Sequence, residues 1–338
     1  MKKNKKDIAI IGPYPPPLGG ISVHIQRMEY FLRREGIDYT IFDHGFNQNE
    51  HVIPTKKSYL WYIIFLFNRS FKVVHFHHFT KFHYFYYFLF SLINKTPFII
   101  TIHNQNLIKF HPVLKRIFLY LLKLTKRKQV ISVSKKVSDL LSNHNISNYY
   151  IPAYVPPVNI NQKEIDLPSN KKIILFSSYR VNKYLAENVY NYPEIFRFIN
   201  ENKKNFHLLL MIGDKKSSDL SYLKTLIRTY KIEKNITLIY DKPLVDYMHN
   251  ADVLIRPTLV DGYGVSLQEA LDLGVPAIAS DVCKRPQGTV IFENDNYEDM
   301  ERKIKETLSL PKSERIKNKE NTDYHIKLLK LYKELLGI

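Results

Sequence analysis

The stretch DGYGVSLQEALDLGVPAIASD, residues 261–281, decides the fold. A loop with Gly262 and Gly264 leads into a segment of helical spacing, which ends in an apolar run typical of a buried strand. Glycines let the backbone approach a ligand, and a helix start carries partial positive charge. Asp261 and Glu269 can therefore face one long ligand, and carboxylates suit the vicinal hydroxyls of a sugar. A capped helix with two incidental acids also fits the pattern.

Apolar runs alternate with helical segments along the whole chain. In the first half the pattern predicts strands at 7–13, 39–44, 73–79, 98–104 and 130–134, and helices at 21–34, 112–128 and 134–144. In the second half it predicts strands at 171–179, 206–214, 236–241, 251–257 and 289–294, with helices at 186–201, 217–231 and around 243–250. Strands that alternate with helices indicate parallel sheets. We therefore expect an α/β protein with two doubly wound, Rossmann-like domains that face each other across a cleft.

The domain boundaries follow from proline. Three prolines in residues 151–162 indicate a linker, and Pro311 indicates a break before the last helices. We expect a first domain over 1–155, a linker over 156–170 and a second domain over 171–310. The helix within 311–338 is expected to pack back toward the first domain.

The composition is that of a packed globular protein, because 45% of the 338 residues are hydrophobic and only 24% are charged. The single cysteine, Cys283, excludes an internal disulfide and fits a reducing cytoplasm. The start of the chain lacks the apolar stretch of a signal peptide, so we expect a cytoplasmic protein. The apolar runs at 59–67 and 82–93 are shorter than the roughly 18 residues of a membrane span, so we expect them to be buried or interfacial.

The net charge of +18 is concentrated in the first half. Residues 1–150 hold 22 Lys and Arg against 7 Asp and Glu, whereas residues 151–338 hold 28 against 25. This asymmetry predicts a polyanionic partner, an anionic membrane or a nucleic acid, although drift of an AT-rich coding sequence toward Lys also explains it. The basic residues lie among apolar helices without a nucleic-acid motif, which favours the membrane.

One predicted helix, 112–128, has the pattern of a helix that lies on a membrane surface. Its apolar face holds Val113, Ile117, Leu121 and Leu124, and its basic residues are Lys115, Arg116, Lys123, Lys126, Arg127 and Lys128. A core helix with a solvated basic face has the same pattern. We expect these basic residues to contact the membrane or the acceptor.

Two further places suit phosphate. Gly19 and Gly20 lie between the first strand and a helix, where free backbone amides can bind an anion, although no G-x-G-x-x-G motif is present. Arg180 and Lys183 follow the first strand of the second domain, at the end of a parallel strand where ligands bind. A plain tight turn and ordinary surface charges are the alternatives.

The stretch 261–281 resembles the nucleotide-sugar site of GT-B glycosyltransferases of family 4, in which two acids flank a glycine loop before a G-x-P-V-I-A-S strand. Gly19-Gly20, the H-x-H of HFHHF, the histidine of TIHN, the strand VISVS and MIGD before a helix follow the family's order. The resemblance spans nearly the whole chain. It implies transfer of a sugar from a UDP- or GDP-sugar with retention of configuration, without a metal or a tightly bound cofactor. It also implies a bacterial enzyme of cell-surface polysaccharide synthesis.

The resemblance also assigns roles to the donor-site residues. Glu269 would bind the ribose hydroxyls and Asp261 the hydroxyls of the transferred sugar. The residues that would line the sugar and diphosphate are Gly19, Gly20, Gly262, Tyr263, Gly264, Val265 and Ser266. The family usually has Glu in place of Asp261, so this acid is one methylene shorter.

Three more residues complete the expected catalytic set. Arg180 and Lys183 would neutralise the departing diphosphate, and His103 would lie beside the transferred sugar. The family usually has its Arg and Lys five residues apart, whereas this pair is three apart. Together with Asp261, these are the residues expected to carry catalysis.

The histidines do not predict a metal site. Along a regular strand His75 and His77 point to one face and His78 to the other, so one ion cannot bind all three, and His83 follows further along. Cys283 has no matching histidine pattern for a nucleophile.

We therefore expect a retaining glycosyltransferase that serves a glycan or lipid-linked acceptor at the inner face of the membrane. Three alternatives stay open: an inactive GT-B partner of another transferase, a protein that binds anionic membranes or nucleic acid, and a sugar-nucleotide epimerase.

Overall fold

The structure is a computed structural model that describes residues 5–56, 58–78, 82–103, 106–316 and 322–338. It divides into two compact units. The first comprises residues 1–16, 20–155 and 323–338, and the second comprises residues 17–19 and 156–322. Each unit is described by itself below.

The first unit is built on a seven-stranded parallel sheet with the strand order β3-β2-β1-β4-β5-β6-β7. The strands are β1 (Lys6–Gly12), β2 (Tyr39–Asp43), β3 (Val52–Pro54), β4 (Phe71–His78), β5 (Phe98–Ile102), β6 (Lys128–Ser132) and β7 (Tyr149–Tyr150). The chain changes direction across the sheet between β1 and β4, so the carboxyl ends of these neighbours form the point where such sheets bind ligands.

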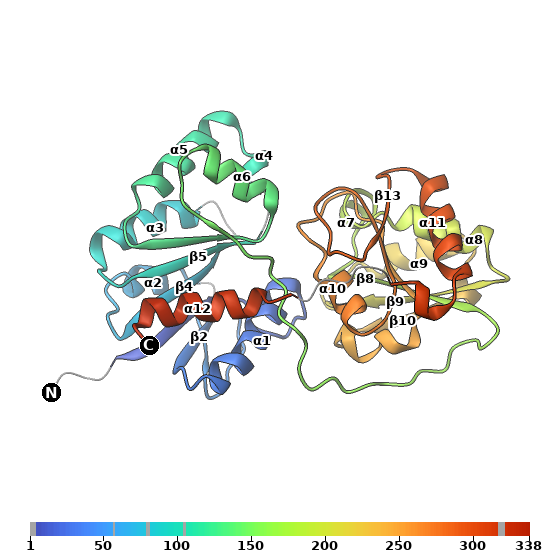
Figure 1. The fold of residues 1–338 in the computed structure, drawn as a ribbon, viewed down its shortest axis with the longest axis horizontal. Helices are drawn as coiled ribbons and strands as arrows, with labels where there is room; N and C mark the ends of the chain where they lie inside the picture. Colours follow the sequence, from blue (N-terminus) through green and yellow to red (C-terminus); the bar gives the residue numbers. More distant parts are fainter. Residues whose placement is uncertain (1–4, 57, 79–81, 104–105, 317–321) are drawn as a thin grey trace. The chain divides into compact units, whose positions relative to one another are not determined.

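Helices cover both faces of this sheet (Figure 1). One face packs against α2 (Tyr59–Phe65), α3 (Phe82–Ile93), α5 (Pro112–Leu124) and α6 (Lys135–Asn143), with the short α4 (Asn106–Lys109) nearby. The other face carries α1 (Gly20–Arg34) and α12 (Tyr324–Leu336), which contact β1 and β4 respectively. The last helix of the chain thus lies beside the first.

The second unit has a six-stranded parallel sheet with the order β10-β9-β8-β11-β12-β13. The strands are β8 (Lys172–Ser178), β9 (Phe206–Ile212), β10 (Ile236–Tyr240), β11 (Val253–Arg256), β12 (Ala277–Ser280) and β13 (Val290–Phe292). The chain adds β9 and β10 on one side of β8 and then adds β11, β12 and β13 on the other side. The order of strands therefore reverses between β8 and β11.

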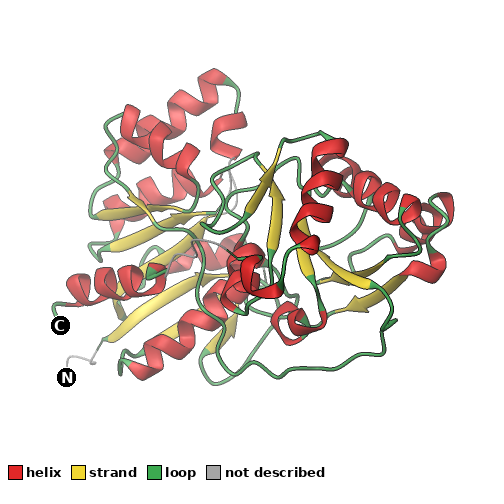
Figure 2. Cartoon of the chain, turned by 45° about the vertical axis from the view of Figure 1, so that its right-hand side comes forward, coloured by secondary structure: helices red, strands yellow, loops and turns green. Residues whose placement is uncertain are grey.

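Two apolar layers enclose this second sheet, with helices on either side (Figure 2). One layer joins the sheet to α7 (Lys183–Asn188), α8 (Tyr192–Glu201), α9 (Leu220–Thr229) and α11 (Tyr297–Ser309). The other joins it to α10 (Val265–Asp272) and the 3-10 turns η2 (Leu244–Asp246) and η3 (Met248–Asn250). Two further 3-10 turns are η1 (Glu233–Asn235) and η4 (Lys312–Glu314).

Three expected helices differ from the structure. The helix expected at 112–128 ends at Leu124, because the Thr125 hydroxyl caps the Leu121 carbonyl and Arg127 takes a left-handed φ of 55°. The helix expected at 186–201 is two helices, separated at Asn191, which is also left-handed. The segment around 243–250 forms 3-10 turns. Within the described residues, no helix is both long and apolar enough to cross a membrane.

Candidate functional site

In the second unit, the predicted donor-site residues follow β8 and β11. At these two neighbouring strands the chain reverses the direction in which it adds strands to the sheet. Tyr179 and Arg180 come directly after β8, and the loop 257–264 comes directly after β11. Because β8 and β11 are parallel neighbours, both segments leave the same edge of the sheet. The carboxyl ends of strands at such a point form the ligand crevice of doubly wound folds.

Gly264 shapes the start of α10. Its φ of +87° is left-handed, and an added Cβ would lie 2.6 Å from Cδ1 of Leu267 and 3.1 Å from Nη1 of Arg285. Only glycine fits such a position without strain. Gly264 is also the N-cap residue and has no side chain to cap the helix, so the helix start depends on this backbone geometry.

The predicted acid Asp261 lies in an ion-pair cluster. Its Oδ2 is 2.5 Å from Nε of Arg256 and 2.6 Å from Nη1 of Arg285. Its Oδ1 accepts the Gly262 amide at 2.8 Å. The two guanidinium groups outweigh the effect of burial and hold the pKa of Asp261 well below its usual range.

The second predicted acid, Glu269, is buried on α10. Two neighbours on the same helix have defined partners, since Ser266 Oγ accepts Nη1 of Arg256 at 3.3 Å and Gln268 donates to Asp272 at 3.1 Å. The Tyr263 hydroxyl donates to Gln268 at 3.2 Å. The Tyr263 side chain is thus buried against α10.

The predicted cations Arg180 and Lys183 are both exposed. The Arg180 guanidinium lies 5.9 Å from the centre of the Tyr179 ring, which holds it loosely over that ring. Lys183 is the first residue of α7, whose N-cap is Asn182. Among the contacts that the structure gives for Arg180 and Lys183, none is an ion pair that would compete with a phosphate.

The predicted glycine pair marks the boundary between the units. Residues 17–19 group with the second unit, whereas Gly20 begins α1 of the first. Within the second unit, a Cβ on Gly213 would lie 2.4 Å from the Leu18 carbonyl oxygen. The G of the MIGD motif is thus required where the segment before Gly19 passes the end of β9.

In the first unit, His103 directly follows β5 and contacts a histidine from the neighbouring strand. Nδ1 of His77 on β4 lies 2.7 Å from Nε2 of His103, so one ring donates to the other. The His24 ring of α1 is 5.5 Å from His77 and 5.6 Å from His103, centre to centre. The sequence identified His77 only as part of a strand motif, whereas the structure brings it to His103.

Burial disfavours the charged form of His24, His75 and His77. It lowers the pKa of His24 to about 4 and holds the pKa values of His75 and His77 well below their usual range. Nδ1 of His24 lies 3.0 Å from the Ala153 carbonyl oxygen. His75 lies between Thr101, 2.7 Å from Nε2, and the Tyr332 hydroxyl.

The four-histidine cluster noted in the sequence is divided. His75 and His77 share one face, as strand alternation predicts, whereas His83 contacts the Tyr62 hydroxyl at 3.1 Å within the apolar layer of α2 and α3. The side chain of His78 lies outside the described part. In the described residues, no group of three or more His, Cys, Asp or Glu is placed to hold a metal ion.

The basic residues expected at the membrane have unequal surroundings. Arg116, Lys123 and Lys126 are exposed, and Lys115 is partly buried. Arg127 is also exposed, but its guanidinium donates to the carbonyls of Ser91 and Asn94 at the end of α3. Lys128 begins β6 and donates to the Thr125 carbonyl at 2.9 Å.

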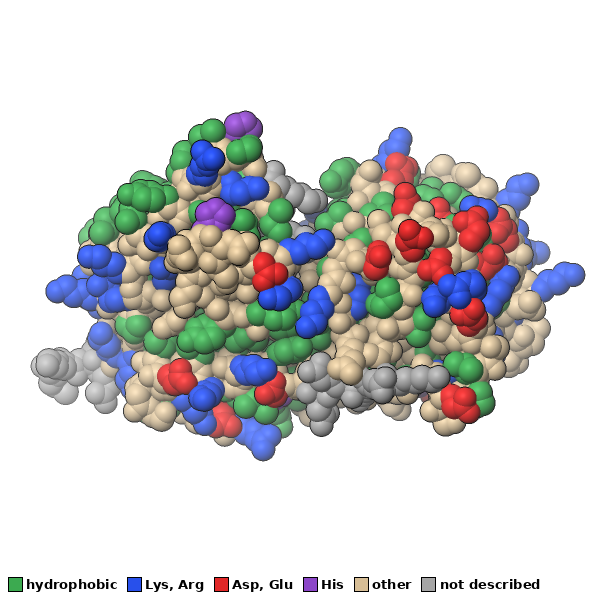
Figure 3. Space-filling view, turned by 45° about the horizontal axis from the view of Figure 1, so that its top comes forward, with side chains coloured by type: hydrophobic (Ala, Val, Ile, Leu, Met, Phe, Trp, Pro, Cys, Tyr) green, Lys and Arg blue, Asp and Glu red, His purple; other side chains and the backbone are tan. Residues whose placement is uncertain are grey.

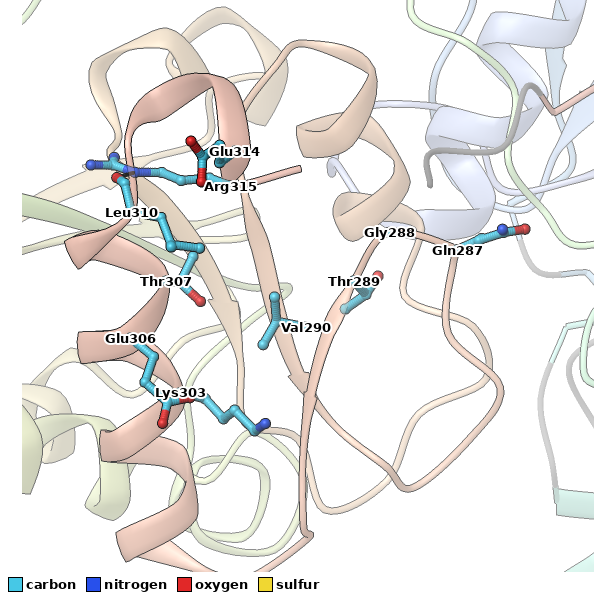
Figure 4. A pocket seen from close by; sticks show the side chains of 10 residues that line it. All are labelled: Gln287, Gly288, Thr289, Val290, Lys303, Glu306, Thr307, Leu310, Glu314 and Arg315. Carbon is cyan, nitrogen blue, oxygen red and sulfur yellow. Dashed lines mark hydrogen bonds between the residues drawn. The ribbon is translucent and has the colours of Figure 1, made fainter. Parts of the chain in front are cut away.

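A separate pocket of about 410 Å³ lies elsewhere in the second unit, between α11 and the start of β13 (Figure 4). Its lining residues are Gln287, Gly288, Thr289, Val290, Lys303, Glu306, Thr307, Leu310, Glu314 and Arg315. None of the residues predicted for the donor site is among them.

The sequence pattern did not reveal several residues of these two clusters. Arg256 and Arg285 were not singled out, although each is a cation directly before a proline. Arg256 ends β11 just before the loop, whereas Arg285 lies 24 residues from Asp261 in the chain. His24 was read only as part of a helix. Tyr332 has no local signal, because it meets His75 across 257 residues of chain.

Residues 158–324, just under half of the chain, match the family model described as "Glycosyl transferases group 1". A search of curated proteins gives no match. Solved structures resemble almost the whole chain at low identity. Sucrose-phosphate synthase from Thermosynechococcus elongatus is 15% identical, with a TM-score of 0.72 over 98% of this chain and 100% of that one.

Two further solved structures are similar over 98% of this chain. WaaG, a glycosyltransferase involved in lipopolysaccharide biosynthesis, is 12% identical with a TM-score of 0.69 over 100% of its chain. HepE of Anabaena, in complex with UDP-glucose, is 12% identical with a TM-score of 0.67 over 99% of its chain. The two parallel-sheet units are those of the GT-B fold, which confirms the expected fold class. The family match supports glycosyltransferase activity.

Proposed function

We propose that this chain is a retaining glycosyltransferase of family 4. It transfers a hexose or a related sugar from a UDP- or GDP-sugar to a glycan or lipid-linked acceptor, in bacterial cell-surface polysaccharide synthesis. One observation carries the proposal. The glycine loop and the start of α10 lie where the strand order of the second sheet reverses, and they belong to the segment that matches the glycosyltransferase family model. The solved HepE complexes with UDP and UDP-glucose support a nucleotide sugar as the donor.

In this proposal the second unit holds the donor. Glu269 accepts the ribose hydroxyls, and the backbone amides from Gly262 to Ser266 contact the sugar and phosphate. Arg180 and Lys183 stabilise the negative charge of the departing diphosphate. Gly19 and Gly20 let the backbone approach the same diphosphate. Neither a metal nor a tightly bound cofactor takes part.

The first unit supplies the acceptor side. His103 lies beside the transferred sugar, and His77 orients its ring through the 2.7 Å contact. No described side chain of the site is an evident nucleophile, so the acceptor hydroxyl attacks from the face that the diphosphate leaves. The product then keeps the configuration of the donor.

We also propose that the first unit rests on the anionic inner face of the membrane. The helices α2, α3 and α5 expose large apolar side chains: Tyr59, Leu60, Ile63, Ile64, Phe85, Leu92, Val113, Leu114, Ile117, Tyr120 and Leu124. Figure 3 shows apolar and basic side chains close together on the first unit. Exposed apolar area of this extent is characteristic of an interaction surface, and the net charge of the first 150 residues suits anionic lipid.

An NMR assay of candidate UDP- and GDP-sugars separates the activities. The proposal predicts that the donor is consumed only with a membrane or glycan acceptor, and that the new linkage keeps the donor's anomeric configuration. Conversion of the sugar without an acceptor would indicate the epimerase. The inactive-partner alternative predicts that every donor stays unchanged, whatever acceptor is added.

Vesicle sedimentation tests the membrane surface. The triple variant Lys115→Glu, Ile117→Ser, Lys123→Glu should lose binding to vesicles with anionic lipid. The double variant Lys224→Glu, Lys234→Glu, which changes exposed lysines of the second unit, is the control and should bind normally. Equal binding by both variants would contradict the membrane role, and retention on duplex DNA alone would favour nucleic acid.

A further inference from the structure

The carboxylate of Asp261 is saturated by groups of its own unit. Oδ2 receives Nε of Arg256 at 2.5 Å, Nη1 of Arg285 at 2.6 Å and the Thr258 hydroxyl at 3.4 Å. Oδ1 receives the Gly262 amide at 2.8 Å and Nη2 of Arg256 at 3.3 Å. A carboxylate offers about four lone-pair sites, so these contacts use its whole capacity.

Arg285 connects this carboxylate to the end of β12. Its side chain is only 2% exposed, and its Nε donates to the Ser280 carbonyl at 2.8 Å. Its Nη2 lies 3.1 Å from the hydroxyls of both Thr258 and Ser280. A guanidinium buried to this degree has no route to a ligand, so its function is to hold the loop.

Arg256 connects the same carboxylate to α10. It is the last residue of β11, and its Nη1 reaches the Ser266 hydroxyl in the first turn of the helix at 3.3 Å. Arg285 also lies close to Gly264, since a Cβ on that glycine would be 3.1 Å from Nη1 of Arg285. The two arginines and Asp261 thus fix β11, β12, the loop and the helix start against one another.

We propose that Asp261 is a positioning residue, held by Arg256 and Arg285, that shapes the loop and the first turn of α10 for the diphosphate of the donor. This inference rests on the proposed function and replaces the sugar-binding role that the family resemblance implies for Asp261. A carboxylate that is bound on both oxygens does not accept the hydroxyls of the transferred sugar. The cluster therefore acts on the nucleoside diphosphate, whether or not a sugar is attached.

The two roles differ in a measurable way. An acid that binds the sugar contributes to the affinity for a nucleotide sugar and nothing to the affinity for the free nucleoside diphosphate. An acid that shapes the loop contributes equally to both. Titration calorimetry with UDP, GDP and their sugars therefore distinguishes them.

Asp261→Asn keeps the shape of the side chain and removes its charge. The positioning role predicts that it weakens free nucleoside diphosphate and nucleotide sugar by the same factor, about tenfold or more. Arg256→Lys, a milder change at a partly exposed side chain, should weaken both in parallel and serves where Asp261→Asn does not fold. Asp281→Asn, at an exposed acid after β12, is the matched control and should bind like the wild type.

The double variant Asp261→Asn, Arg256→Lys completes the test. The effects of substitutions within one cluster on affinity are not additive, so the double variant should bind no more weakly than Asp261→Asn alone. Normal affinity for the free nucleoside diphosphate, with a loss confined to the nucleotide sugar, would overturn the inference and leave the donor site intact. Absence of any nucleotide binding by the wild type would instead overturn the proposed function, and the inference with it.

Discussion

The Tyr332 hydroxyl lies 2.5 Å from Nδ1 of His75, so the last helix of the chain is bound to the centre of the first sheet. Nε2 of the same imidazole lies 2.7 Å from the Thr101 hydroxyl on the next strand. Lys333 adds an exposed ion pair with Glu35 at 2.5 Å. The chain thus leaves the first unit at Val155 and returns to it at Asp323.

This contact predicts the effect of Tyr332→Phe. The ring is fully buried, so the change leaves one histidine nitrogen without its partner and should lower the free energy of unfolding by about 1–3 kcal/mol. Urea denaturation measures the loss. Tyr120→Phe, at a side chain that is 62% exposed, is the control and should change stability by less than about 0.5 kcal/mol. Equal stability of the two variants would show that the contact to His75 contributes nothing.

The buried histidines predict acid sensitivity in a defined range. In the unfolded chain a histidine has a pKa of about 6.5, whereas burial lowers that of His24 to about 4 and those of His75 and His77 well below 6.5. The unfolded state therefore binds protons first as the pH falls. The contribution of these histidines to the free energy of unfolding should be fully present above about pH 6.5. It should decrease toward pH 4, by up to about 1.4 kcal/mol per pH unit for each histidine.

Urea denaturation between pH 7 and 5 measures this slope. His24→Gln removes one titrating group and should give a shallower slope than the wild type. His144→Gln changes an exposed histidine and should leave the slope as it is. A slope in His24→Gln as steep as in the wild type would contradict the assignment.

The start of α10 predicts different costs for two glycine substitutions. Gly264 and Gly274 both have left-handed φ values, +87° and +76°, but only Gly264 has atoms close to the position of a Cβ. Gly274→Ala should therefore cost about 1 kcal/mol of backbone strain, and Gly264→Ala clearly more. Thermal unfolding of both variants measures the difference. Similar melting temperatures would mean that Leu267 and Arg285 move aside without cost.

Arg127 should contribute to the stability of the fold, whether or not it also contacts a membrane. Its guanidinium bonds two carbonyls at the end of α3, so Arg127→Ala should destabilise the protein by about 1 kcal/mol. Arg116→Ala, at an exposed residue of α5, should be neutral in the same urea titration. If both variants unfold at the same urea concentration, the contact to α3 is not stabilising.

Much of this fold could be predicted from local patterns. Apolar runs such as those of β1 and β9 are fully buried between helices, so their hydrophobicity alone indicates parallel strands. The turn at Gly264 is predictable for the same reason, because only glycine takes its backbone conformation freely. The short strands β3 and β7 were missed, since three and two residues carry too little pattern.

The partners of the site residues could not be predicted in this way. The sequence shows two acids near a loop, but the saturation of Asp261 depends on Arg285, which lies 24 residues away in the segment after β12. The helix predicted at 112–128 was four residues too long, because Thr125 and Arg127 end α5 through contacts with a carbonyl of α5 and with α3. Such long-range contacts follow from the topology and leave no periodic trace.

The central claim, a nucleotide-sugar site on the second unit, is tested most directly by a thermal-shift titration. UDP, GDP, ADP and their common sugar conjugates are added to the wild type, to Glu269→Gln and to Glu233→Gln, which changes an exposed acid of the same unit. A donor site that depends on Glu269 predicts that one nucleotide family stabilises the wild type and Glu233→Gln, and that Glu269→Gln loses the shift. Absence of a shift with every nucleotide, or a full shift in Glu269→Gln, would contradict it.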